Sequence, residues 1–279
     1  ACRARLNYCE NAMTDTPHLL IEEQGAILIA TLNRPDKLNA LTAQAMELFE
    51  QALHHFRDTP ELKVMLVRAT GRYFCSGVDL RSGKPTPMLT GSSIREQHRL
   101  RTMGMHRIYD EMEAIEKPIV VAHQGPCVGG GLELSLSCDF RLAASSASYA
   151  FPEGKFGVLP ASNGVSRLAR IIGTHWTRYI IMANLAVDAD KAMIMGLVHE
   201  VFPDDSFEEQ VMQFCSHLAA QNGEQMGLAK IAIELAHDVG LAQARNVERM
   251  ANSALMLAPA YREGIERYIK GIGSGGADK

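Results

Sequence analysis

The chain has 279 residues, of which 47% are hydrophobic and 22% charged, so it is long enough to bury a sizeable core in one large domain or two. Its formal net charge of −4 gives no general attraction to nucleic acid or to an anionic membrane surface. No apolar run approaches the roughly 18 residues needed to cross a bilayer, which argues against a membrane protein.

The first twelve residues, ACRARLNYCENA, are polar and lack the apolar core of a secretory signal, whereas the stretch that begins at Met13 resembles an ordinary start. We expect residues 1–12 to be a disordered leader or vector-derived remnant outside the fold. Without an export signal the expected location is the cytoplasm, or an organelle matrix if these residues remain from a transit peptide.

Strands and helices alternate through the first two thirds of the chain. Near-continuous apolar strands between amphipathic helices predict an α/β core, with a sheet that is covered on its faces. In helix 42–56 the apolar face consists of Met46, Phe49, Leu53 and Phe56. The expected elements are strand 26–32, helix 42–56, strand 64–69, helix 95–116, strand 118–123, and strand and turn 140–151.

From about residue 174 the pattern changes to one helix after another, broken by glycine and proline. The expected helices cover 175–183, 188–195, 207–221, 227–238 and 244–257. We therefore predict a core over residues 13–205, a helical C-terminal region over 206–270, and a mobile tail rich in glycine and serine over 271–279.

The six cysteines form no C-x-x-C pair, and three of them lie in apolar runs. This pattern favours buried, reduced thiols over disulfides or metal ligands, and we expect no metal site. The cysteines are Cys2, Cys9, Cys75, Cys127, Cys138 and Cys215.

Three consecutive glycines, Gly129, Gly130 and Gly131, stand at a predicted strand-to-helix junction, just before Glu133. The first N–H groups of a helix have no partner within it and lie at the positive end of its dipole, so they suit a developing negative charge. Neither the Walker, the dinucleotide nor the G-x-S-x-G pattern can be placed here. The glycines therefore predict an anion site made of backbone N–H groups.

Five blocks, in this order and spacing, resemble the crotonase family, and within it the enoyl-CoA hydratases, over residues 18 to 270. The resemblance implies a spiral of β-β-α turns, a helical C-terminal region used for assembly into trimers or hexamers, and an acyl-CoA thioester as substrate. Coenzyme A is then part of the substrate, and no cofactor is expected. The blocks are NRPDKLNAL, GRYFCSGVDL, HQGPCVGGGLELSLSCDFRLA, YAFPEGKFGVLP and DADKAMIMGLVHEVFP.

By this resemblance the backbone N–H groups of Ser76 and Gly130 would bind the thioester oxygen as it becomes an enolate. Glu133 and Glu153 fall on the positions of the paired catalytic glutamates. Adding water across a conjugated double bond needs one group to activate water and another to deliver a proton at Cα. We assign Glu133 to the water, because a helix N-terminus favours its ionised form, and Glu153 to the proton. Their titrations should be coupled.

The resemblance further implies a loop along the CoA nucleotide and a position close to the pantetheine path at Asp79. One departure from the family pattern lies after Glu153, where larger residues replace the family's small ones in a segment whose backbone helps to hold the water. These residues could narrow the pocket or redirect the acyl group. The loop residues are Arg34, Lys37, Leu38, Asn39 and Ala40, and the departing residues are Ala161, Ser162 and Asn163.

The expected function is hydration of 2-enoyl-CoA thioesters to 3-hydroxyacyl-CoA. The nearest alternative is a Δ3,Δ2-enoyl-CoA isomerase, and other enolate reactions remain open because the same oxyanion site serves them. A non-catalytic or RNA-binding relative is a third possibility, for which residues 95–107 offer a local basic patch, although the acidic balance argues against nucleic acid.

Overall fold

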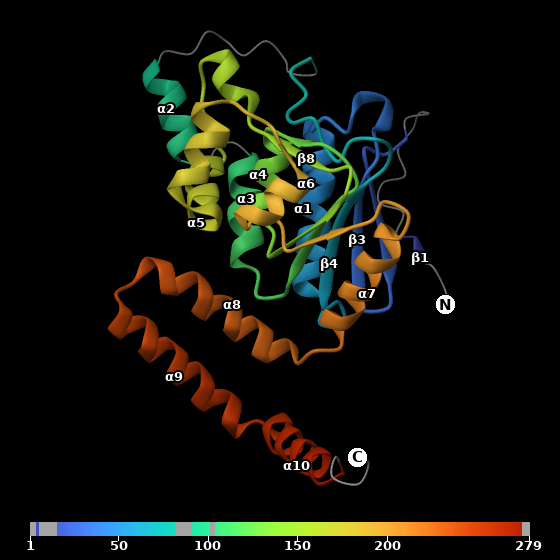
Figure 1. Cartoon of the computed structure of the whole chain (residues 1–279), viewed down its shortest axis with the longest axis vertical. Coiled ribbons are helices and arrows are strands. Elements are labelled where there is room, and N and C mark those ends of the chain that lie inside the picture. The colour runs from blue at the N-terminus through green and yellow to red at the C-terminus, as the bar shows by residue number, and fades with distance from the viewer. Residues whose placement is uncertain (1–3, 6–15, 82–90, 101–103, 275–279) are drawn as a thin grey trace. The chain divides into compact units, whose positions relative to one another are not determined.

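A computed structural model describes residues 4–5, 16–81, 91–100 and 104–274 (Figure 1). The chain divides into two compact units, one up to Ala220 and one from Gln221. Within the expected leader, Ala4–Arg5 form a short strand that pairs with Glu22 and Glu23. The rest of that segment, with Cys2 and Cys9, lies outside the described residues, as do 275–279 of the expected tail.

The first unit contains a seven-stranded sheet in the order β1-β2-β3-β4-β5-β7-β10. β1, β2 and β3 pair antiparallel, and all later neighbours pair parallel. Every residue of β3 and of β5 is buried, which explains why these strands are apolar on both faces. The strands are β1 Ala4–Arg5, β2 Leu19–Gln24, β3 Ile27–Leu32, β4 Val64–Ala69, β5 Ile119–His123, β7 Phe140–Ala144 and β10 Glu200–Phe202.

Helices cover both faces of this sheet. On one face, α1 (Ala43–Asp58) packs against β2 and β3, and it buries the four apolar residues that the sequence predicted. Its first turn is capped by the Thr42 hydroxyl, which accepts from the N–H of Ala45 at 3.1 Å. α7 (Phe207–Ala219) contacts β3, β4 and β7 through the opposite face (Figure 1).

The predicted helix 95–116 consists of two helices in the structure, α2 (Gly91–Arg99) and α3 (Gly104–Ala114). A glycine inside a helix costs about 1 kcal/mol relative to alanine, and Gly104 stands at the start of α3 instead. The strand 118–123, the helix 42–56 and the strands 26–32 and 64–69 are confirmed to within two residues at each end.

A second, smaller sheet has the order β6-β8-β9, formed by Cys127–Val128, Ser148–Ala150 and Val187–Asp188. The glycine run leads directly from β6 into α4 (Gly130–Leu136), as expected for a strand-to-helix junction. The remaining elements of the first unit are a 3-10 helix at Pro35–Lys37, a 3-10 helix η2 at Pro152–Phe156, α5 Gly164–Thr177, a π-helix at Arg178–Met182 and α6 Ala189–Met195.

The second unit consists of α8 (Gly223–Asp238), α9 (Leu241–Leu257) and α10 (Pro259–Ser274). The helices of the expected C-terminal region begin with α7 at Phe207, whereas the division into compact units falls after Ala220, because α7 packs on the sheet of the first unit. Residues 271–274 of the expected tail belong to α10.

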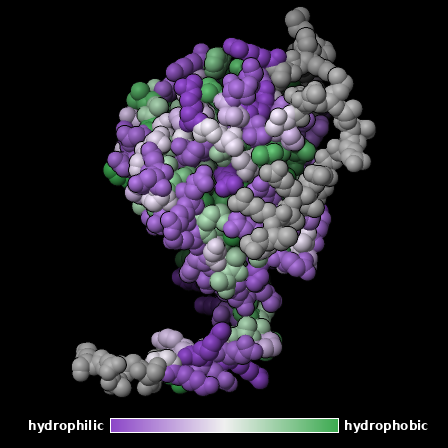
Figure 2. All heavy atoms as spheres, turned by 90° about the vertical axis from the view of Figure 1, so that its right-hand side faces the viewer, coloured by the Kyte–Doolittle hydropathy of each residue, from purple (hydrophilic) through white to green (hydrophobic). Residues whose placement is uncertain are grey.

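The surface of the molecule was expected to be mainly polar, since the apolar side chains form its core. The face drawn in Figure 2 carries mostly hydrophilic residues, with hydrophobic ones scattered among them. Within the ranges that the structure describes, no helix combines the length and the apolar character needed to cross a membrane.

Candidate active site

Two of the three glycines at the start of α4, Gly129 and Gly131, are required for different reasons. Gly129 has a φ of +54°, in the left-handed region that favours glycine, and a Cβ there would lie 2.8 Å from Oε1 of Glu153. A Cβ on Gly131 would lie 2.5 Å from the Cβ of Cys75. Because these glycines have no side chain, the carboxyl group of Glu153 can lie against Gly129, and Cys75 can lie against Gly131.

Two backbone N–H groups beside these glycines are unpaired within the described residues. Gly130 begins α4, so its N–H has no partner inside the helix, and the N–H of Val78 makes no hydrogen bond. A Cβ on Gly130 would lie 3.5 Å from the Val78 nitrogen, and one on Gly77 would lie 3.4 Å from the Gly130 nitrogen. These two donors are therefore neighbours.

The structure corrects the predicted partner of Gly130. The N–H of Ser76 donates to the carbonyl of Leu38 at 3.0 Å, so it is already used within the fold. Val78, two residues later, has the available N–H and faces Gly130. Since every residue except proline carries an N–H, no sequence signal could distinguish these two positions.

Glu133 lies in the first turn of α4, and only 4% of its surface is exposed. Its Oε1 accepts the backbone N–H of Ser162 at 2.7 Å. A Cβ on Gly164, the first residue of α5, would lie 3.0 Å from the same oxygen. The carboxyl group is therefore packed tightly against the start of α5.

Glu153 reaches the same region from η2, the 3-10 helix that follows β8. Its Oε1 lies beside Gly129, and its Oε2 is buried without a hydrogen-bond partner among the described residues. A carboxyl oxygen in such surroundings is more easily protonated than one in water.

Burial raises the pKa of both glutamates. For Glu133 burial is the largest cause, the charge of Glu153 adds to it, and the pKa reaches about 7 even though the Ser162 N–H and the charge of Arg167 lower it. The pKa of Glu153 is raised as well, again chiefly by burial. We expected the helix N-terminus to keep Glu133 ionised, but loss of hydration outweighs the seven-residue helix.

The segment after η2 contacts Glu133 directly. Ser162 is buried and supplies its N–H, whereas Ala161 is exposed. Asn163 has a left-handed φ of 65°, and its side-chain amide donates to the carboxylate of Asp110 on α3. The Asn163 side chain is thus held by α3, a placement that the sequence pattern did not indicate.

The predicted nucleotide loop is joined directly to the loop that carries Val78. Leu38 accepts the N–H of Ser76 at 3.0 Å, the N–H of Leu41 donates to the carbonyl of Gly77 at 2.8 Å, and Leu41 and Val78 form an isolated parallel bridge. A ligand lying along the first loop would therefore pass next to the pair of N–H groups.

Within the predicted nucleotide loop, several side chains serve the fold. Arg34 pairs with Asp79 at 3.0 Å and also donates to the carbonyl of Ala40 at 2.9 Å, which gives Asp79 a structural role that the sequence did not suggest. Asn39 is buried, and its amide donates to the carbonyls of Thr70 and Tyr73. Lys37 is exposed in the 3-10 helix.

Other titratable groups near the core match ordinary packing. His123 is fully buried in β5, its Nδ1 lies 3.1 Å from the Tyr149 hydroxyl, and burial lowers its pKa to about 3, which fits the core histidine that its apolar strand suggests. Cys75, Cys127, Cys138 and Cys215 are free and buried, as predicted. Among the residues described, no cluster of His, Cys, Asp and Glu could hold a metal ion.

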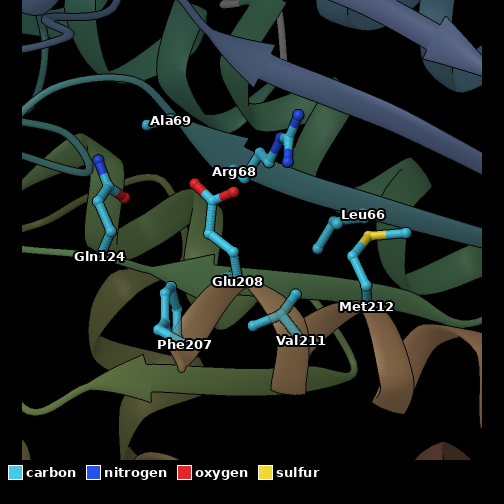
Figure 3. Close-up of a pocket in the computed structure, with 9 residues that line it drawn as sticks. Leu66, Arg68, Ala69, Gln124, Phe207, Glu208, Val211 and Met212 are labelled. Atoms are coloured by element: carbon cyan, nitrogen blue, oxygen red, sulfur yellow. The ribbon is translucent and has the colours of Figure 1, made fainter. Parts of the chain in front are cut away.

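A small hollow lies elsewhere, between β4, β5 and α7 (Figure 3). Its lining includes Leu66 and Ala122, whereas their neighbours Met65 and Val121 belong to the core shared with α4, so the hollow opens on the opposite face of the sheet. The carboxylate of Glu208 points toward Arg68 across it (Figure 3). It is separate from the glutamate pair.

The sequence is similar to a known family and to individual proteins named for related reactions. Residues 22–271 match the family described as enoyl-CoA hydratase/isomerase. The 2,3-dehydroadipyl-CoA hydratase of Escherichia coli is 28% identical over 90% of this chain and 95% of its own length. The enoyl-CoA isomerase/hydratase fer4 of Mycosarcoma maydis is 31% identical over 85% of this chain and 87% of its own.

Solved structures of enoyl-CoA hydratases have a similar fold. The crystal structure of enoyl-CoA hydratase from Bacillus anthracis superimposes with a TM-score of 0.82 and 25% identity, over 91% of this chain and 96% of that one. The predicted crotonase-like α/β fold with a helical C-terminal region is thereby confirmed. The chain belongs to the enoyl-CoA hydratase/isomerase, or crotonase, family.

Proposed function

We propose that this protein hydrates 2-enoyl-CoA thioesters to 3-hydroxyacyl-CoA. The observation that carries the proposal is the meeting of a buried and a half-buried carboxyl group, both with raised pKa values, beside two backbone N–H groups that are unpaired among the described residues. Hydration needs a base, an acid and an oxyanion site together. Isomerisation, in which one proton leaves one carbon and enters another, needs a single base.

In this mechanism the ionised Glu133 removes a proton from water as the water oxygen bonds to Cβ. The electron pair of the double bond moves toward the thioester, and the N–H groups of Val78 and Gly130 stabilise the oxygen as it becomes negative. Glu153 then delivers a proton to Cα. Each aligned oxyanion donor of this kind typically contributes roughly 10²- to 10³-fold in rate.

The two carboxyl groups need one proton between them at the start of the reaction. A pKa near 7 for Glu133 leaves it partly ionised at neutral pH, so that it can act as the base, and burial raises the pKa of Glu153 above the ordinary value of a glutamate, which makes its protonated form more accessible. Below about pH 7 the rate should fall as Glu133 becomes protonated, and at higher pH it should fall again as the shared proton is lost.

The relatives support hydration without excluding isomerisation. One is named a crotonyl-CoA hydratase and another a 2,3-dehydroadipyl-CoA hydratase, whereas the fungal relative is named an isomerase/hydratase. The presence of both Glu133 and Glu153 at one site favours hydration, because a second carboxyl group has a role in that reaction and none in a one-base isomerisation.

The test is the hydration of crotonyl-CoA, followed by loss of its enoyl thioester absorbance, in wild-type protein, Glu153→Gln and Glu208→Gln. We expect Glu153→Gln to lower kcat by several orders of magnitude, and Glu208→Gln, an exposed glutamate across the sheet, to leave it unchanged. A Glu153→Gln variant that hydrates normally while wild-type protein isomerises a 3-enoyl-CoA faster would refute the proposal.

A further inference from the structure

α4, the short helix that carries Glu133, is held at both ends by buried polar contacts. At its start, the hydroxyl of Tyr109 on α3 donates to the carbonyl of Gly130 at 3.1 Å. At its end, the hydroxyl of Ser137 donates to the carbonyl of Glu133 at 2.9 Å and accepts from Nη1 of Arg167 at 2.8 Å. Both neighbouring helices, α3 and α5, therefore fix the position of α4.

Arg167 is the centre of these contacts, and only 6% of its side chain is exposed. Its Nε and Nη2 both donate to the carboxylate of Glu113, so the pairing is a two-point fork. Nη2 also donates to the carbonyl of Tyr109 at 3.1 Å and to Asp110 at 3.2 Å. The guanidinium of Arg167, on α5, thus binds three residues of α3 and also binds Ser137 at the end of α4.

The same carboxylate of Asp110 reaches back to the active site. It accepts a hydrogen bond from the side-chain amide of Asn163, which stands at the N-cap position of α5. The preceding residue, Ser162, donates its N–H to Glu133. The arginine cluster therefore controls the position of the group that holds the catalytic carboxyl.

Stability alone does not explain an arginine buried in this place. A buried ion pair gains little over apolar packing of the same volume, because removing two charges from water offsets their attraction. A guanidinium does differ from an apolar side chain in the fixed plane and number of its donors, which set the spacing between the helices that it joins.

We propose that Arg167 is a positioning residue for Glu133, holding the start of α5 and the end of α4 so that the Ser162 N–H and the carboxyl group meet in the reactive geometry. The catalytic part of this inference rests on the proposed function, but the geometric part does not.

The charge of Arg167 has a second effect on the same group. Glu133 is faced by Glu153 from η2, by the Tyr109 hydroxyl from α3 and by Arg167 from α5. Of these, Arg167 lowers the pKa of Glu133 and Glu153 raises it. Removing the positive charge should therefore raise the pKa of Glu133, which reduces the fraction of ionised base at a given pH and moves the acid limb of the kcat profile to higher pH.

Two variants separate geometry from charge. Arg167→Lys keeps the charge and loses the fork, so we expect kcat to fall about 10- to 100-fold, KM to stay within about threefold, and the acid limb to remain in place. Arg167→Met loses both, so kcat should fall and the acid limb should also move up by about half a pH unit or more. Thermal unfolding and circular dichroism show which variants are folded at the assay temperature.

Arg57→Met is the matched control. Arg57 pairs with Glu111, the residue next to Asp110 on α3, but it does so from α1 and is half exposed. Losing this pair should leave kcat and the acid limb unchanged. A loss of kcat in Arg57→Met as large as in Arg167→Lys would overturn the proposal, because any disturbance of α3 would then suffice.

A direct titration separates failure of this inference from failure of the proposed function. The carboxyl resonance of Glu133, in protein labelled with ¹³C at glutamate carboxyls and assigned by its loss in Glu133→Gln, should titrate at higher pH in Arg167→Met than in wild-type protein. That shift in a protein without hydratase activity would refute the proposed function and support the positioning role. A folded Arg167→Met protein with unchanged Glu133 titration and unchanged kcat would overturn the inference.

Discussion

The surroundings of Glu133 shift its pKa in two opposing directions. Burial raises its pKa to about 7, while the N–H of Ser162 and the charge of Arg167 lower the pKa and favour the carboxylate. The balance leaves an anion that is costly to bury and yet available near neutral pH. A general base works best with a pKa near the operating pH, so the same environment that destabilises the fold suits the chemistry.

This conflict predicts a pH-dependent effect of Glu133→Gln on stability. The pKa of Glu133 is raised from 4.5 in the unfolded chain to about 7 in the folded one, so its stabilising contribution is complete below pH 4.5 and is lost as the pH rises through 7. Glutamine can still accept from Ser162 and carries no charge. We expect the variant to be more stable than wild-type protein at pH 8, by on the order of 1–3 kcal/mol.

Urea unfolding at pH 5 and at pH 8 measures this difference, which should be small at pH 5 because little of the ionisation cost has then developed. An equal difference at both pH values would show that the effect comes from packing and not from ionisation. The same variant should lose hydratase activity by several orders of magnitude, so stability and activity change in opposite directions.

At the scale of elements, the start of α5 decides how the active site is supported. Asn163 adopts a left-handed φ of 65° at the N-cap and bonds to Asp110, while its neighbour Ser162 binds Glu133. Asparagine tolerates this conformation better than most residues, because its short polar side chain can bond locally. The turn therefore combines a backbone requirement with a contact to α3.

Comparing Asn163→Gly with Asn163→Ala separates these two contributions. Glycine accepts the left-handed conformation but loses the bond to Asp110, whereas alanine loses the bond and adds backbone strain of about 1 kcal/mol. We expect the free energy of unfolding to decrease in the order wild-type, glycine, alanine, and kcat to follow that order. An alanine variant as stable as the glycine variant would show that the turn does not retain its left-handed conformation.

At the scale of the whole molecule, the second unit has almost no core of its own. Among its described residues only Gly227 and Ala244 are buried. Large apolar side chains are strongly exposed along its helices, and exposed apolar surface of this kind marks interaction sites. They include Ile233, Leu241, Met250, Leu257, Tyr268 and Ile269, each more than 60% exposed.

We propose that this surface is covered by other copies of the chain, in the trimer or hexamer that the family resemblance implies. Sedimentation should give three or six times the chain mass of 30.6 kDa. Leu257→Glu, which places a charge at a side chain that is 85% exposed, should shift the population toward single chains. A wild-type protein that sediments as a monomer at micromolar concentration would contradict this proposal.

Features that depend on a local pattern could be predicted from the sequence. Continuous apolar runs identified β3, β4 and β5, and helical periodicity identified the buried face of α1. The glycine run marked the strand-to-helix junction before α4, where a side chain would collide with neighbouring residues. The motifs also led to Glu133 and Glu153, which both lie beside that glycine run in the structure. The second sheet and the start of α5 were missed, because short strands and a left-handed turn leave weak periodicity.

Which groups are available at the site depends on contacts between segments that are distant in the sequence. Val78 rather than Ser76 has the available N–H, because a carbonyl at Leu38, far away in sequence, occupies the other. Arg34 is held by Asp79, and Glu133 is largely stripped of water despite its place in the first turn of a helix. Hydrogen-bond partners and dielectric surroundings depend on which distant segments meet, and a local sequence pattern carries no information about those meetings.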